Sequence, residues 1–322
     1  MAASLVEGLL QFYIFIAAGF VIGYLLERRH MREKASKIFT KLVLYVLSPI
    51  AIFISLVNVD ISLSFEMVLS IMLTQITTAF LMMTICYFSL RKKNLPKEKL
   101  GGYILISGFP NATIFPLPII ISSFGEAFII IPVLFSTPAL LLRGTLGTYI
   151  SIKMGDNDAE HVSLKSTLKK MILFPPTLAI LVSVVFLLFP QIDWSSLDGV
   201  KSLISPAISI FGALTIGLII AGLKKESIGQ FKHDIPRTMV FRFLLPPIFF
   251  LLFSVLLIFP ENASIIKSIL LLEVSGPPAI MNAMFAVNFN LDKDFVASMV
   301  VVLTLFMILL APIILLLGTV LF

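Results

Sequence analysis

Charged residues are scarce in this chain of 322 residues: they make up 13% of the sequence, whereas hydrophobic residues make up 58%. A soluble globular domain is about 25% charged and about 45–50% apolar. A water-soluble fold cannot hide so much apolar side chain, because burial saturates as a domain grows. The composition therefore excludes a soluble enzyme, a nucleic-acid-binding domain and a secreted disulfide scaffold, and it predicts an integral membrane protein.

Cysteine and histidine are also rare. Cys86 is the only cysteine, so no disulfide can form within the chain. His30, His161 and His233 lie between the apolar runs, and no aspartate lies inside one. This argues against a zinc site, a histidine-based dyad or paired aspartates within the membrane. No GxxxxGK[ST] phosphate-binding sequence is present. We therefore expect no metal, no cofactor and no enzymatic activity.

Long apolar runs are what the chain has in abundance. A hydrocarbon layer about 30 Å thick requires about 20 helical residues, and ten runs are candidates. They are continuously apolar rather than alternating, which favours an all-α protein over a β-barrel. The predicted spans are 8–26, 38–57, 67–90, 100–123, 127–150, 170–189, 202–222, 238–259, 264–288 and 295–321.

Lysine and arginine are distributed unevenly between the loops. They gather after the odd-numbered spans, whereas the opposite loops hold only Lys201 and Lys267. By the positive-inside rule, the basic loops are cytoplasmic. The sequence thus predicts a multi-pass protein of the cell membrane with both termini extracytoplasmic. The same rule accounts for the net charge of +6 without a nucleic-acid partner.

A long polar stretch after the fifth span divides the chain into two halves. The predicted domains are a first five-helix repeat over 1–152, a cytoplasmic connecting loop over 153–169 and a second repeat over 170–322. Because five is odd, the second half enters the membrane with opposite polarity, so an inverted repeat is geometrically available. Pro49 and Pro206, at comparable depths in spans two and seven, support it.

The fourth and ninth spans contain residues that interrupt a helix near its middle. Proline lacks an amide donor and clashes with the preceding helical turn. Matching interruptions in two halves are typical of a transporter's substrate site, and the alternative is an ordinary proline kink in each helix. The residues concerned are Pro110, Asn111, Pro116 and Pro118 in the fourth span, and Gly276, Pro277, Pro278 and Asn282 in the ninth.

An interrupted helix presents unpaired amides at the start of its second half, and together with the helix dipole these favour an anion. Asn111 and Asn282 add side-chain donors that can orient a carboxylate. The predicted substrate-binding residues are therefore Asn111, Pro116, Pro118, Gly276, Pro277, Pro278 and Asn282, together with Arg143.

Three charged side chains lie well inside predicted spans: Arg143, Arg242 and Glu273. A charge at the bilayer centre costs at least about 2.5–3.5 kcal/mol. Burial favours the neutral form of a carboxyl group, which makes Glu273 a candidate proton carrier; the alternative is a permanent ion pair with an arginine. Arg143 either attracts a substrate anion or extends to the lipid surface. Arg242 is about one turn inside its span, so we expect it to extend to the surface.

Six segments in this order resemble the auxin efflux carrier family, and the likeness covers nearly the whole chain. They are AAGFVIGYLLERR, KLVLYVLSPIAIF, NATIFPLP, FPPTLAIL, FRFLLPP and SGPPAIMNAM. NATIFPLP is similar to the family's crossover motif at Asn111 and Pro118, and SGPPAIMNAM matches at Pro278 and Asn282. Two departures stand out: the chain lacks the long cytoplasmic loop of many plant members, and Glu273 occupies a position where a neutral residue is expected.

The resemblance implies ten transmembrane helices in two inverted five-helix repeats, with broken helices 4 and 9 that cross, an NhaA- and bile-acid-symporter-like fold. It also implies a scaffold domain, a transport domain and a homodimer in the lipid bilayer. The function it implies is elevator-type secondary transport of small organic anions, carboxylates above all. Separately from the resemblance, Glu273 makes protons the candidate coupling ion. The alternative from the sequence is a channel or a ligand sensor built on a transporter fold.

Overall fold

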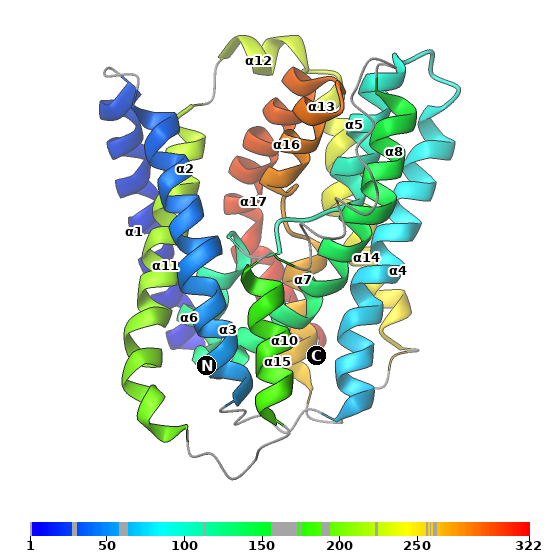
Figure 1. Cartoon of the computed structure of the whole chain (residues 1–322). Coiled ribbons are helices and arrows are strands. Elements are labelled where there is room, and N and C mark those ends of the chain that lie inside the picture. The colour runs from blue at the N-terminus through cyan, green and yellow to red at the C-terminus, as the bar shows by residue number, and fades with distance from the viewer. Residues whose placement is uncertain are drawn as a thin grey trace. The chain divides into compact units, whose positions relative to one another are not determined.

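The computed structural model describes residues 2–27, 31–57, 64–112, 114–155, 173, 175–187, 194–222, 225–255, 257, 259 and 263–322. Within these residues all regular secondary structure is helical, apart from one isolated β-bridge (Figure 1). Six helices there are long and apolar enough to cross a membrane. They are Leu10–Glu27, Phe65–Leu90, Glu126–Met154, Ser202–Ile220, Asp234–Phe253 and Lys293–Leu321.

These six helices correspond to predicted spans one, three, five, seven, eight and ten. The second predicted span is a continuous helical segment over residues 32–57, and the fourth and ninth are each divided into two helices. The eighth begins earlier than predicted, at Asp234 rather than at residue 238. Residues 156–169 of the predicted connecting loop lie outside the described residues.

The chain folds into two compact units, each assembled from three separate segments. Unit 1 comprises Met1–Ser64, Thr113–Leu134 and Lys170–Gly222, and unit 2 comprises Phe65–Ala112, Phe135–Lys169 and Leu223–Phe322. Each unit therefore takes residues from both halves of the sequence. This division groups segments by packing, whereas the predicted repeats group them by internal likeness, so the predicted repeats remain a prediction.

Unit 1 is built around the contact of α1 with α11. Its helices are α1 (Ala2–Glu27), α2 (Arg32–Leu42), α3 (Ser48–Val57), α6 (Pro116–Phe124), α10 (Pro175–Leu187) and α11 (Asp198–Ile220). Helix α1 packs on α11 and α6, and α10 packs on α3. A Cβ on Gly19 would lie 2.3 Å from the backbone oxygen of Leu214, and one on Gly217 would lie 2.2 Å from that of Ile16. The two backbones therefore approach as closely as small residues allow.

Unit 2 carries the interrupted ninth span and the first half of the fourth. Its helices are α4 (Phe65–Leu90), α5 (Lys97–Gly108), most of α7 (Ile130–Leu142), α8 (Thr148–Met154), α12 (Lys225–Gln230), α13 (Asp234–Met239), α14 (Leu245–Phe253), α15 (Ser264–Val274), α16 (Ile280–Asn288) and α17 (Lys293–Leu321). Figure 1 shows α5 beside α4 and α8, with which it packs. Tyr103, Phe109 and Phe295 belong to the core of this unit and are fully buried.

In the part of the chain that the structure describes, single π-helical turns interrupt three helical segments: η1 (Val43–Leu47), η3 (Arg143–Gly147) and η5 (Val240–Leu244). π-Helical turns are rare in proteins overall, and those that occur often lie at functional sites. The two buried arginines predicted within spans both lie on these turns, Arg143 on η3 and Arg242 on η5.

Helix α17 presents an apolar stripe to its surroundings. Leu309, Ile313, Leu316 and Val320 are between 58% and 81% exposed. Their spacing of four, three and four residues places them on one helical face. In water such a stripe would be a liability, but a bilayer solvates it. The stripe therefore fits the membrane environment predicted from composition.

The α1–α11 contact yields a stability prediction. Gly217→Ala should destabilise the protein by about 1–3 kcal/mol, because the new methyl group would meet backbone atoms of α1 that cannot rotate away. Thermal unfolding in detergent measures the effect. Gly199→Ala, on the same helix with nothing within 4 Å of the added Cβ, is the control and should be neutral or stabilising. Equal melting temperatures for the two variants would contradict the close contact.

Candidate functional site

The interruption of the fourth span starts where α5 ends at Gly108. Phe109 has an extended backbone, with φ −120° and ψ 96°. The residue before a proline is driven out of the helical region by the proline ring, and Pro110 has no amide with which to continue the helix. The chain resumes a helix only at Pro116, the first residue of α6. The interruption predicted from the prolines is thus present.

The ninth span breaks in the same way. Helix α15 ends at Val274, and Gly276 leads into Pro277 and Pro278. Ala279 is extended, with φ −63° and ψ 140°, and α16 begins at the next residue. A Cβ on Gly276 would lie 3.1 Å from the Glu273 backbone oxygen and 3.5 Å from that of Asn111. A small residue is therefore favoured where the two interrupted segments pass.

The two interruptions meet in unit 2 as an antiparallel β-bridge between Pro110 and Pro278. The Asn111 amide donates to the Pro277 carbonyl at 2.6 Å, and the Ala279 amide donates to the Phe109 carbonyl at 3.0 Å. In both segments, the residue after the bridging proline donates its amide, and the residue before the proline accepts with its carbonyl. This crossing pairs two amides and two carbonyls that lie outside the helices.

The Asn282 side chain forms a hydrogen bond with the backbone at the crossing. Its side-chain Nδ2 donates to the Phe109 carbonyl at 3.1 Å, and the residue is fully buried. Its Oδ1 atom has no partner among the described residues. Asn111 is also buried, with its backbone in the bridge. The bridge uses the backbone amides of Asn111 and Ala279. The first amides of α16, at Ile280 and Met281, are therefore the ones that can face an anion.

Arg242 does not extend to the surface, so the prediction of a surface-seeking side chain is wrong. The residue is 1% exposed. Its Nε donates to the Gly276 carbonyl at 2.8 Å, one terminal nitrogen donates to the Ser107 carbonyl at 2.8 Å, and the other donates to the Val274 carbonyl. The side chain extends from turn η5 into unit 2, where these three carbonyls satisfy it.

Arg143 is likewise buried, at 5% exposure, so it does not reach the surface either. Its guanidinium lies 5.0 Å from the ring centre of Phe109, and a terminal nitrogen lies 3.4 Å from the Met281 sulfur. Its Nε has no hydrogen-bond partner, and Arg143 forms no ion pair with any residue that the structure describes. A positive charge thus lies beside the crossing and the first turn of α16, against an aromatic ring and a thioether.

Glu273 is fully buried in the last turn of α15. Within the described residues, neither carboxylate oxygen has a hydrogen-bond partner, and no arginine pairs with it. Arg242 approaches the same turn but donates to backbone carbonyls that follow Glu273, at Val274 and Gly276. The structure therefore gives no support to the ion-pair alternative for this residue.

Pro116 and Pro118 belong to a different environment from the rest of the predicted site. Both are buried in the first turn of α6, in unit 1. Pro118 contacts Gly212 on α11, where a Cβ would lie 2.8 Å from its Cγ. The described geometry thus gathers Asn111, Arg143, Gly276, Pro277, Pro278 and Asn282 in unit 2, and it shows Pro116 and Pro118 setting the start and packing of α6.

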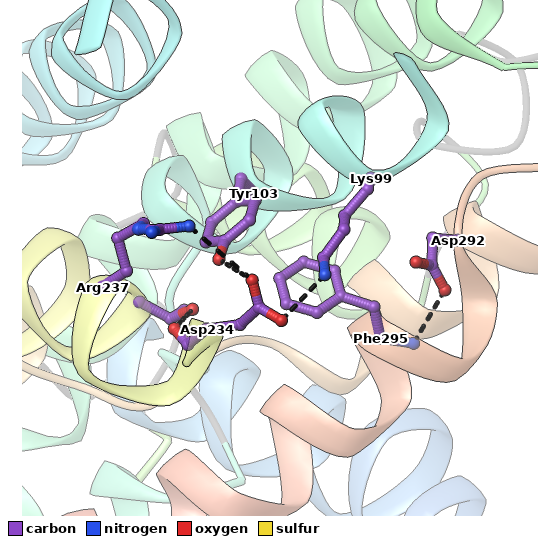
Figure 2. A network of polar contacts seen from close by, with 7 residues as sticks. Lys99, Tyr103, Asp234, Arg237, Asp292 and Phe295 are labelled. Carbon is purple, nitrogen blue, oxygen red and sulfur yellow. Dashed lines mark hydrogen bonds and ion pairs between the residues drawn. The ribbon is translucent and has the colours of Figure 1, made fainter. Parts of the chain in front are cut away.

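A second polar cluster in unit 2 was missed from the sequence (Figure 2). Asp234 accepts hydrogen bonds from the Tyr103 hydroxyl at 2.6 Å and from Lys99 Nζ at 2.8 Å. Lys99 also lies 5.2 Å from the ring centre of Phe295 on α17. Asp292 caps α17 by accepting from the Phe295 amide at 3.0 Å. The cluster ties α5, α13 and α17 together; the acidic start of the eighth helix, in HDIPR, was the available signal.

A multi-pass membrane protein in which two interrupted helices cross, with a buried cation beside them, has the organisation of a membrane transporter. Residues 5–315 match the family described as membrane transport protein, and the chain belongs to it. This confirms the family assignment drawn from the motifs.

Two relatives match this chain over most of their own length. An uncharacterised transporter of Methanocaldococcus jannaschii is 27% identical over 287 residues, which is 87% of this chain and 88% of that protein. An uncharacterised transporter of Methanothermobacter thermautotrophicus is 26% identical over 290 residues, 88% of this chain and 90% of that protein.

The Asp234 cluster predicts a loss of stability when its acceptor is neutralised. Asp234→Asn should destabilise the protein by about 1–3 kcal/mol, because Lys99 would keep a largely buried charge without its partner. Thermal unfolding in detergent provides the measurement. Asp294→Asn, an exposed residue on α17, should leave stability unchanged. If Asp234→Asn melted with Asp294→Asn at the wild-type temperature, the cluster would have no role in holding the helices.

Proposed function

We propose that this protein is a secondary transporter of small organic anions, with carboxylates as its substrate class. The observation that carries the proposal is the environment of Arg143: buried, unpaired with any described carboxylate, and next to the first turn of α16. A carboxylate there would meet a guanidinium and the positive end of a helix at once. Membership of a membrane transport family supports movement of that anion across the bilayer.

The substrate site comprises Asn111, Arg143, Gly276, Pro277, Pro278 and Asn282, all of which lie in unit 2. Pro116 and Pro118 set the start of helix α6, in unit 1. Arg143 supplies the charge, and the amides of Ile280 and Met281 supply directional donors. Asn111 orients the carboxylate. Asn282 and the three residues Gly276 to Pro278 hold the crossing in shape. The close approach at Gly276 supports the last assignment.

The chain crosses the membrane ten times, as two inverted five-helix repeats with both termini extracytoplasmic. Helices α5 and α15 have 12 and 11 residues, and α6 and α16, after the interruptions, have nine each. The two backbone hydrogen bonds on either side of the Pro110–Pro278 bridge are equivalent under a two-fold rotation. Both observations support two copies of one motif running in opposite directions.

Transport proceeds by an elevator-like motion in which unit 2 is the moving body that holds the substrate. The division of the chain into two compact units supports it, because a carrier of this type needs a moving body that keeps its own core. A homodimer would provide the stationary body with a broader anchor in the lipid.

Glu273 couples the anion to a proton. An isolated carboxylate is costly in the membrane interior, and neither carboxylate oxygen of Glu273 has a hydrogen-bond partner among the described residues. The titratable side chains on helices that pack against α15 are Glu66, Cys86 and Tyr87 on α4 and Lys293 and Asp294 at the start of α17, while α14 carries none. Lys267 lies on α15 itself, and Arg242 donates to carbonyls beside Glu273.

Uptake of radiolabelled monocarboxylates and dicarboxylates into proteoliposomes tests the function. A carrier should show saturable uptake that an unlabelled carboxylate inhibits and its uncharged amide does not. Linear, non-saturating flux would indicate a channel, and binding without flux would indicate a sensor. Absence of both binding and flux for every carboxylate would overturn the proposal.

Arg143→Gln should reduce uptake by about tenfold or more, because a charge-assisted contact worth roughly 1.5–3 kcal/mol is lost. Asn111→Ala should also impair uptake more than it lowers the melting temperature. The control is Arg91→Gln, an exposed arginine after α4, which should transport like the wild type. Wild-type uptake by Arg143→Gln would remove this residue from the site.

Glu273→Gln should flatten the dependence of uptake on pH. The amide imitates the protonated carboxyl group, so the variant cannot gain or lose the coupling proton. Initial rates over a pH series, with an imposed pH gradient and without one, provide the measurement. Glu66→Gln is a matched control near the start of α4. A pH profile identical to that of the wild type would exclude proton coupling through Glu273 and leave the fold unaffected.

A further inference from the structure

The arginine on turn η5 makes an unusual set of contacts. Arg242 uses all three nitrogens of its guanidinium on backbone carbonyls: Ser107 in the last turn of α5, Val274 at the end of α15, and Gly276 in the interruption beyond it. Within the described residues it forms no ion pair with a carboxylate. A buried guanidinium without an acidic partner requires another source of negative potential.

The ends of the two interrupted helices provide that potential. The last carbonyls of a helix have no partner within it, and the end carries a partial charge of about −0.5. Helices α5 and α15 both end at the crossing, so their carboxyl ends together bring about −1 to one place. One arginine cancels this charge and occupies the unpaired carbonyls at the same time.

We propose that Arg242 is a positioning residue of the anion site: its guanidinium clamps the carboxyl ends of α5 and α15 and neutralises them. This inference rests on the proposed anion transport. Without Arg242, the negative helix ends would oppose the anion that Arg143 attracts. With it, the amino end of α16 and Arg143 remain as net positive groups beside the crossing. Arg143 and Arg242 thus have separate tasks, one toward the substrate and one toward the backbone.

A lysine and a glutamine at position 242 separate charge from geometry. Arg242→Lys keeps the charge but cannot present a planar fork to three carbonyls. Arg242→Gln removes the charge. The control is Arg237→Gln, which removes the same charge from the preceding helix α13, where the side chain is 40% exposed and 3.9 Å from Asp234.

The first measurement is peptide-level hydrogen exchange over residues 109–112 and 275–280, which requires no substrate. Arg242→Gln should speed exchange of the bridge amides by about tenfold or more, since a charged hydrogen bond contributes roughly 1.5–3 kcal/mol. Arg237→Gln should leave exchange unchanged. Unchanged exchange in Arg242→Gln would overturn the clamp.

The second measurement is the Kd of folded protein for malonate, or for the carboxylate that most stabilises the wild type. Arg242→Gln should raise Kd about tenfold or more, and Arg242→Lys about threefold. A purely structural role would lower the melting temperature and leave Kd of the folded fraction unchanged, which would overturn the electrostatic role. If Arg242→Gln does not fold, the same two measurements are made on Arg242→Lys. Unchanged hydrogen exchange together with an unchanged Kd in Arg242→Lys would then overturn the proposal. Failure of the wild type to bind any carboxylate would refute the proposed function, while exchange would still test the clamp.

Discussion

Pairing of two short extended segments is the constraint on which unit 2 depends. Inside a bilayer, a peptide group outside a helix must find a partner within the protein. Proline creates that need twice, at Pro110 and at Pro278, and each interrupted segment supplies the donor and acceptor that the other lacks. Either interruption alone would leave buried backbone unsatisfied, so the two are stable only as a pair.

The two buried arginines at the crossing differ in the groups that they contact. Arg242 finds three carbonyls at helix ends, and these hold it in place. Arg143 lies against a phenyl ring and donates to a thioether, which is a weak acceptor, and its Nε has no partner among the described residues. Two arginines, each on a π-helical turn, thus make different contacts: Arg242 binds backbone carbonyls, and Arg143 lies against a ring and a thioether.

Away from the crossing, the Asp234 cluster joins three helices of unit 2 through one carboxylate. Tyr103 and Lys99 lie one turn apart on α5, so both reach Asp234 on α13, and the aromatic ring of Phe295 covers Lys99 from α17. The first half of the interrupted fourth helix is thus fixed at its start by polar contacts and at its end by the bridge. A rigid support of this kind keeps a binding site in shape.

The sequence by itself determined the membrane class, the apolar helices, the two interruptions and the family, because composition and proline act locally, on the residues that carry them. It did not determine where the arginines point. Arg242 lies one turn inside a predicted span and was expected to extend outward, yet its partners at Ser107 and Val274 are 135 and 32 residues away in the chain. The pairing of Phe109 with Ala279 and of Lys99 with Asp234 likewise joins distant segments. Only the tertiary structure brings such groups together, because a hydrogen bond or ion pair depends on distances of a few ångströms that local sequence patterns do not specify.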